Sequence, residues 1–148
     1  YHEIVDTKRI FLRRLYNRNG MLIAGVCEKP FYPSTDIITI IPFRINIRLL
    51  TLILNSSFVQ DFVIRKFNSI NKVDFQQLTP SDVRKIPIPN IVLHNGDRHL
   101  SLKRKNELIE VKRRLLRIET KIRKSLNESI RDYSIEINKL IRWLYEYI

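Results

Sequence analysis

The chain has 148 residues, of which 44% are hydrophobic and 28% charged, so it can bury one core of ordinary size. Its most apolar run, residues 45–54, is interrupted by Arg48 and is shorter than the ~20 residues that a bilayer span requires. The net charge of +12 and the pI near 10.1 are typical of a nucleic-acid-binding domain. The alternative is a basic protein that binds an acidic partner.

Cys27 is the lone cysteine and allows no internal disulfide, so we expect a reducing compartment, the cytoplasm. The chain opens with YHEIVDTKR, which has no apolar signal segment. It does not begin with Met, and we therefore expect a piece of a longer protein.

Short strands and a helix are predicted for the first part of the chain. The β-rich runs at 10–15 and 21–28 flank an Asn-Gly pair at 19–20, which predicts a β-hairpin. The apolar run at 36–41 favours a buried strand. Apolar side chains at helical spacing within 45–67 predict one largely buried helix: Leu50, Ile53, Leu54, Phe58, Phe62 and Val63.

A strand, a capped helical turn and an extended proline segment are predicted within residues 75–90. The strand is FQQLT, and Thr79 is suited to the helix N-cap that follows it. Pro80 fits the first helical position, and Asp82 favours the positive end of the helix. Two residues then end the turn and keep the chain extended: Pro87 and Pro89.

Residues 101–148 contain neither Gly nor Pro and predict helix. Their apolar residues form two seams with three- and four-residue steps: Leu108, Val111, Leu115, Ile118 and Ile122, then Ile130, Tyr133, Ile137, Leu140 and Leu144. The phase shifts between the seams, where residues 125–128 resemble a capping box. This pattern favours a helical hairpin, with one long kinked helix as the alternative. Residues 101–125 also hold ten Lys or Arg against three Glu.

The predicted fold class is therefore α+β. We expect a small mixed β-sheet body with one buried helix over residues 1–93 and a loop at 94–100. A C-terminal helical hairpin, or a long helix, should occupy residues 101–148.

The sequence offers no catalytic, cofactor or metal constellation. Three Gly cannot build a phosphate-binding loop, and one Cys with three scattered His gives no zinc spacing. Glu110-Val-Lys112 and Glu119-Thr-Lys121 match half of a metal-nuclease motif, but both lie on the predicted basic helix as ordinary surface charges. We expect Cys27 to be a packed core thiol rather than a nucleophile, and the chain to be a binding module.

Residues 75–90 resemble the segment that closes the specificity, or target recognition, domain of TaqI-like adenine-specific DNA methyltransferases. That segment runs from a short strand through a Ser-Asp-Leu-type turn into Ile-Pro-Ile-Pro. Further segments resemble this family in the same order: 10–14 and 22–24 its first strands, 31–42 an aromatic stretch and strand, 49–56 a helix with a Leu-Asn-Ser triplet, and 137–145 its closing helix.

The resemblance implies double-stranded DNA as the ligand. It also implies a methyltransferase or endonuclease domain or subunit as the partner, and S-adenosylmethionine would belong to that missing catalytic part. This chain has no Asn-Pro-Pro-aromatic motif and no cofactor loop, so we expect no catalysis from it alone. Two departures from the family are Gln76, where Pro is common, and a tail without the Leu-Tyr-Gly stop.

Two polar loops, 16–20 and 65–72, are the expected DNA-reading segments, because Arg, Asn and Gln pair with base edges. Solvated turns are the alternative explanation of such loops. The second loop should be the main reader, through Asn and Gln at base edges and Arg and Lys at phosphates. The candidate DNA contacts are Arg13, Arg14, Asn17, Arg18, Asn19, Arg65, Lys66, Asn68, Asn71, Lys72, Gln76 and Gln77.

Three functions fit these features. The first is the recognition domain of a type II restriction-modification enzyme or adenine-specific methyltransferase. The second is half of a type I specificity subunit, whose spacer helices hold a methyltransferase subunit. The third is a basic helical scaffold that binds RNA or an acidic partner without sequence preference.

Overall fold

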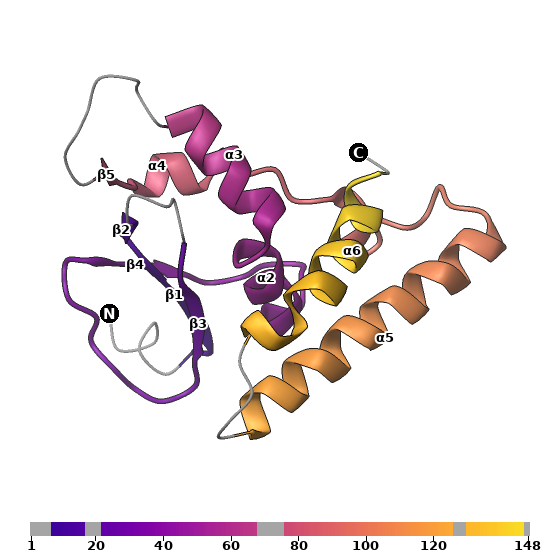
Figure 1. Cartoon of the computed structure of the whole chain (residues 1–148), viewed down its shortest axis with the longest axis horizontal. Helices are drawn as coiled ribbons and strands as arrows, with labels where there is room; N and C mark the ends of the chain where they lie inside the picture. Colours follow the sequence, from indigo (N-terminus) through magenta and orange to yellow (C-terminus); the bar gives the residue numbers. More distant parts are fainter. Residues whose placement is uncertain (1–6, 17–21, 68–75, 126–129, 147–148) are drawn as a thin grey trace.

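The computed structural model describes residues 7–16, 22–67, 76–125 and 130–146 (Figure 1). Three strands form an antiparallel sheet in the order β3-β1-β4: β1 (Arg9–Arg13), β3 (Ala24–Cys27) and β4 (Ile37–Ile40). Leu12 lies opposite Ala24 and Ile38, and all three side chains are buried on the face that meets the helices. The predicted pairing of the first two runs is confirmed, and the fold class is α+β.

β4 is an edge strand, not the fully buried strand that its apolar run predicts. Ile38 is buried, whereas Ile37, Thr39 and Ile40 are half-buried and Ile41 is 47% exposed. The reason is that an antiparallel sheet with helices on one face buries only alternate residues. The run of β-branched residues therefore reflects strand propensity rather than burial on both sides.

The helix predicted over 45–67 is two helices, α2 (Ile47–Leu54) and α3 (Ser57–Phe67), which meet at an angle of 57°. Six residues of α2 are buried, but α3 buries only Val59 and Val63, and Phe58 is 40% exposed. The break follows Asn55, the C-cap of α2. Periodicity alone did not indicate it, because both helices face the same core.

The capped turn at residue 80 is confirmed as α4 (Pro80–Val83). The Thr79 hydroxyl accepts the backbone N–H of Asp82, and the Asp82 carboxylate accepts the backbone N–H of Thr79 at 3.0 Å, which completes a capping box. The extended proline segment leads into a short 3-10 helix, η1 (Asn90–Val92). Ile91 and Val92 anchor it in the core.

The C-terminal helices form the favoured hairpin: α5 (Leu102–Lys124) and α6 (Ser134–Tyr145) lie side by side and antiparallel, with η2 (Ile130–Tyr133) before α6 (Figure 1). The capping box predicted at 125–128 extends beyond the described residues. α5 packs against α2, and α6 packs against α3. Leu115 of α5 and Leu144 of α6 are fully buried in a core that also contains Ile10 of β1. The helical tail and the sheet body therefore share one hydrophobic core.

Among the described residues, no single helix has the length and apolar character to cross a membrane, although the bent pair α2 and α3 has both when taken together.

Candidate nucleic-acid interface

A second, two-stranded sheet brings the ends of the two predicted loops together. It pairs β2 (Leu15–Tyr16) with β5 (Gln76–Gln77) in antiparallel register, with Tyr16 opposite Gln76. Tyr16 is the last residue before 17–21, and Gln76 is the first residue after 68–75. The chain therefore leaves β2 and enters β5 at the same end of this sheet, so the first segment begins where the second ends, although about 60 residues separate the two strands.

The C-terminal end of α3 belongs to the same region. Figure 1 places that helix end at the corner where β2 and β5 lie. α3 ends at Phe67, immediately before the second loop segment. Each end of the second segment is thus held by an element of regular structure, which is the arrangement that a reading loop needs if its side chains are to keep register.

Arg13 and Arg14, predicted together as DNA contacts, have different surroundings. Arg13 is exposed at the end of β1. The Arg14 guanidinium donates hydrogen bonds to the main-chain oxygens of Leu78 at 3.2 Å and Thr35 at 3.0 Å. Arg14 therefore clamps the β1–β2 junction to the start of α4, which is a structural role. Contact between its remaining donors and DNA stays a prediction.

Of the other candidate residues, some belong to described elements and some lie outside the described residues. Arg65 and Lys66 are exposed in the last turn of α3, where positive side chains also complement the helix dipole. Gln77 is exposed on β5, and Gln76 belongs to the same strand. Six candidates lie outside the described residues: Asn17, Arg18, Asn19, Asn68, Asn71 and Lys72.

The structure adds Lys85 to this region. Its ammonium lies 5.9 Å from the ring centre of Phe67 and 3.6 Å from a carboxylate oxygen of Asp82. The side-chain hydrogen bond from Thr79, and then the backbone hydrogen bond from the same residue, lower the pKa of Asp82. Lys85 lies two residues after the end of α4, and its approach to α3 depends on tertiary packing. No sequence pattern indicated it.

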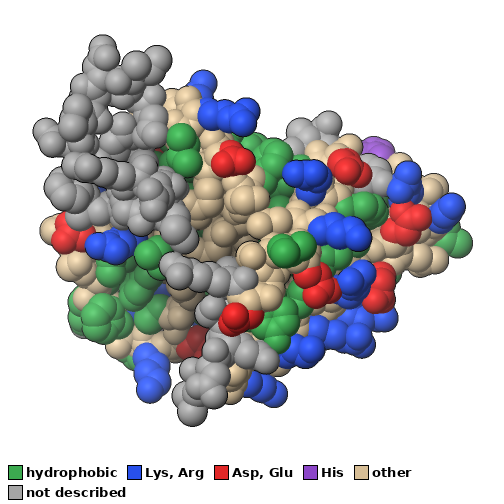
Figure 2. Space-filling view, viewed as in Figure 1, with side chains coloured by type: hydrophobic (Ala, Val, Ile, Leu, Met, Phe, Trp, Pro, Cys, Tyr) green, Lys and Arg blue, Asp and Glu red, His purple; other side chains and the backbone are tan. Residues whose placement is uncertain are grey.

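Positive charge is also concentrated on α5, away from the loop base. Figure 2 shows Lys and Arg side chains along this helix. Ile109, which is 53% exposed, and Leu116 form a shallow apolar groove there with a rim of Lys112, Arg113 and Arg117. Burial lowers the pKa of Lys112. This face of α5 therefore has an apolar centre with basic edges.

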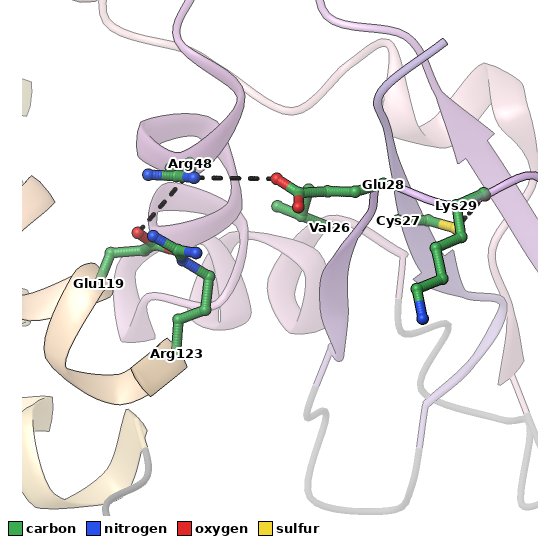
Figure 3. A pocket seen from close by; sticks show the side chains of 7 residues that line it. All are labelled: Val26, Cys27, Glu28, Lys29, Arg48, Glu119 and Arg123. Atoms are coloured by element: carbon green, nitrogen blue, oxygen red, sulfur yellow. Dashed lines mark hydrogen bonds and ion pairs between the residues drawn. The ribbon is translucent and has the colours of Figure 1, made fainter. Parts of the chain in front are cut away.

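A separate charged cluster joins the sheet to α5. Arg48 of α2 lies between Glu28 and Glu119, with 3.8 Å from Arg48 Nη2 to Glu28 and 3.8 Å from Arg48 Nε to Glu119 (Figure 3). Arg123 Nε is 3.5 Å from the other Glu119 oxygen. These charges pair with one another, so we interpret the cluster as a connection between the two parts of the fold. Cys27 lines the same pocket and is half-buried, so it is not the core thiol that the sequence predicts, because its place at the end of an edge strand leaves it beside the pocket.

The described residues form a small α+β module in which the chain enters segment 17–21 and leaves segment 68–75 at one end of the β2–β5 pair. The family model for the TaqI-like C-terminal specificity domain matches residues 1–88, more than half of the chain. The chain therefore belongs to this family, as its sequence resemblance predicts. The match ends at Ile88, so α5 and α6 lie outside it. No curated protein and no solved structure matches the chain.

Proposed function

We propose that this chain reads the sequence of double-stranded DNA for an adenine-specific methyltransferase or a restriction-modification enzyme whose catalytic part is a separate domain or subunit. The observation that supports this most directly is the β2–β5 pairing, which joins the start of the first polar segment to the end of the second. Family membership and the charge of +12 support it independently.

The proposed division of labour assigns base reading to amides and phosphate contact to cations. Asn68, Asn71, Gln76 and Gln77 are the proposed base readers, since Asn and Gln pair bidentately with adenine. Arg65, Lys66 and Lys72 are the proposed phosphate anchors, and Lys85 joins them because it lies beside Phe67. The hairpin segment with Asn17, Arg18 and Asn19 provides a second set of contacts.

The test is a selection from randomised duplexes with the full chain. Alanine at one base reader should relax discrimination at one position and cost ~1–3 kcal/mol on the preferred site. Alanine at a phosphate anchor should weaken all sequences alike. Asn106→Ala, an exposed amide on α5, is the matched control and should leave the selected motif unchanged. If all four Asn and Gln variants also recover the parent motif, base reading does not reside in the second loop.

We propose that the catalytic partner binds the Ile109–Leu116 groove of α5. Its apolar centre and basic rim fit a helix with an apolar face and acidic edges. In the second candidate function, half of a type I specificity subunit, α5 would be the helix that holds the methyltransferase subunit. Arg113→Glu should weaken co-purification with the catalytic subunit while folding is retained, and retention of full binding would contradict this site.

A further inference from the structure

The corner between α2 and α3 carries two side-chain amides that reach the sheet. Asn55 ends α2, and Gln60 lies one turn into α3. Between them, the Ser56 hydroxyl donates to the main-chain oxygen of Ile53 at 2.6 Å and accepts the N–H of Val59 at 3.4 Å. Ser56 is 1% exposed, so the corner is fixed by buried hydrogen bonds.

Each amide satisfies both backbone groups of one residue. Asn55 Oδ1 accepts the N–H of Ala24 at 2.9 Å, and Asn55 Nδ2 donates to the Ala24 oxygen at 2.9 Å. Gln60 does the same for Leu22: its Oε1 accepts the Leu22 N–H, and its Nε2 donates to the Leu22 oxygen at 3.1 Å. Two amides thus make the four hydrogen bonds that a neighbouring strand would make.

These bonds lie on the open edge of the sheet. β3 is an edge strand whose other side pairs with β1. Leu22 and Ala24 are two residues apart, so their polar groups point to the same side of the extended chain. An edge strand without a partner exposes its backbone groups. Asn55 and Gln60 occupy that edge and attach it to the α2–α3 corner.

The attachment connects the two loop segments. Leu22 is the first described residue after 17–21, and Gln60 is on the helix that ends at Phe67, where 68–75 begins. We infer that Asn55 and Gln60 are positioning residues that set the first reading loop relative to α3 and hence to the second. This inference rests on the proposed function. It also gives the Leu-Asn-Ser triplet at 54–56 a physical role.

The variant that tests this role is Gln60→Glu. A glutamate carboxylate still accepts the Leu22 N–H, but it replaces the amide donor with an oxygen that faces the Leu22 carbonyl oxygen. Protonation restores an O–H donor at that position. Because only the protonated form makes both bonds, the carboxyl pKa should rise above its usual ~4.3. Asn55→Asp makes the same change to the two hydrogen bonds with the Ala24 backbone.

The readout is the ratio of affinities for the selected duplex and a scrambled duplex, measured at pH 7.5 and pH 5. We expect Gln60→Glu to reduce this ratio at least tenfold at pH 7.5, with unchanged affinity for scrambled DNA and an unchanged circular dichroism spectrum. The ratio should recover towards the wild-type value at pH 5. Asn106→Asp makes the same change of charge at an exposed site and should match wild type at both pH values.

Two outcomes separate this inference from the proposed function. If wild type shows no preference for any duplex, the proposed function fails, and the positioning role for base reading fails with it. If wild type discriminates and the folded Gln60→Glu and Asn55→Asp variants discriminate equally well at pH 7.5, the positioning role is wrong and the proposed function stands.

Amide hydrogen exchange in the wild-type chain gives a test that needs no variant. The N–H groups of Leu22 and Ala24 should exchange as slowly as those of β1, although no strand among the described residues pairs with that edge. Rapid exchange of both backbone N–H groups, with β1 protected, would show that the side-chain amides of Asn55 and Gln60 do not bind this edge.

Discussion

The hydroxyl of Tyr145 on α6 donates a hydrogen bond to the main-chain oxygen of Pro87 at 2.6 Å. The same ring stacks on Phe58 of α3 with ring centres 3.8 Å apart. One side chain therefore joins the Ile-Pro-Ile-Pro segment to both helices. That segment follows β5 and α4, so the contact lies downstream of the strand at which the second loop segment ends.

Tyr145→Phe should lower the free energy of unfolding by about 0.5–1.5 kcal/mol, because it removes one buried hydrogen bond and keeps the stacked ring. Burial raises the pKa of the Tyr145 phenol. A raised folded-state pKa means that this stabilisation is complete below the unfolded-state value of 10.0 and declines as pH rises above it. The wild-type chain should therefore lose more stability between pH 9 and pH 11 than Tyr145→Phe does.

Denaturant unfolding at both pH values measures this difference. Tyr32→Phe is the control, since Tyr32 is 59% exposed and its replacement should change stability by less than ~0.5 kcal/mol. Equal alkaline losses in wild type and Tyr145→Phe would contradict the assignment of a buried phenol.

Thr79→Ala should lower stability by about 0.5–2 kcal/mol through loss of the N-cap of α4. The Thr79 hydrogen bonds lower the pKa of Asp82 below 3.8. A depressed pKa contributes stability above the unfolded-state value, and the contribution is lost as pH falls through the folded-state value. The gap between wild type and Thr79→Ala should therefore narrow between pH 5 and pH 2. Ser81→Ala, an exposed change in the same helix, should show no such narrowing.

Local patterns predicted much of this fold. Thr79, Pro80 and Asp82 were placed correctly because capping depends on adjacent residues. The seam through Leu108 and Leu115 was placed correctly because helical periodicity repeats along one face.

Long-range relationships could not be predicted in this way. The pairing of Tyr16 with Gln76 joins distant segments and has no local pattern. The hydrogen bonds between the Asn55 side-chain amide and Ala24 depend on the angle between two helices, which periodicity did not indicate. The candidate site therefore needs tertiary information: the sequence could nominate both loops but could not show that their ends meet.

Leu115→Ala should destabilise the chain by ~2–5 kcal/mol, because Leu115 is fully buried where α5 meets the core. Ile109→Ala on the same helix should change stability by less than ~0.5 kcal/mol, since that side chain is 53% exposed. Thermal unfolding of both variants compares the two faces of α5. A larger loss from Ile109→Ala than from Leu115→Ala would show that the buried and exposed faces are reversed.

Arg14→Ala should mainly lower stability, whereas Arg13→Ala should mainly weaken DNA binding. The first removes the guanidinium that bonds to Leu78 and Thr35, so it should cost about 1–3 kcal/mol of stability. The second removes an exposed cation and should change stability by less than ~0.5 kcal/mol while weakening DNA binding. Urea unfolding and DNA titration of both variants separate the roles. Destabilisation by Arg13→Ala alone would contradict the clamp.

DNA affinity should fall steeply as salt rises, because each phosphate contact releases about 0.9 of a counterion. Fluorescence anisotropy of the full chain with a labelled duplex across a salt series measures the slope of log affinity against log salt.

If Arg65 and Lys66 each contact a phosphate, alanine at either should reduce that slope by about 1 and weaken specific and scrambled duplexes alike. Lys139→Ala, an exposed cation on α6, is the control of equal charge and should leave the slope unchanged. A slope equally reduced by all three variants would mean that net charge, and not the end of α3, determines binding. A slope near zero for wild type would remove the electrostatic basis for DNA as the ligand.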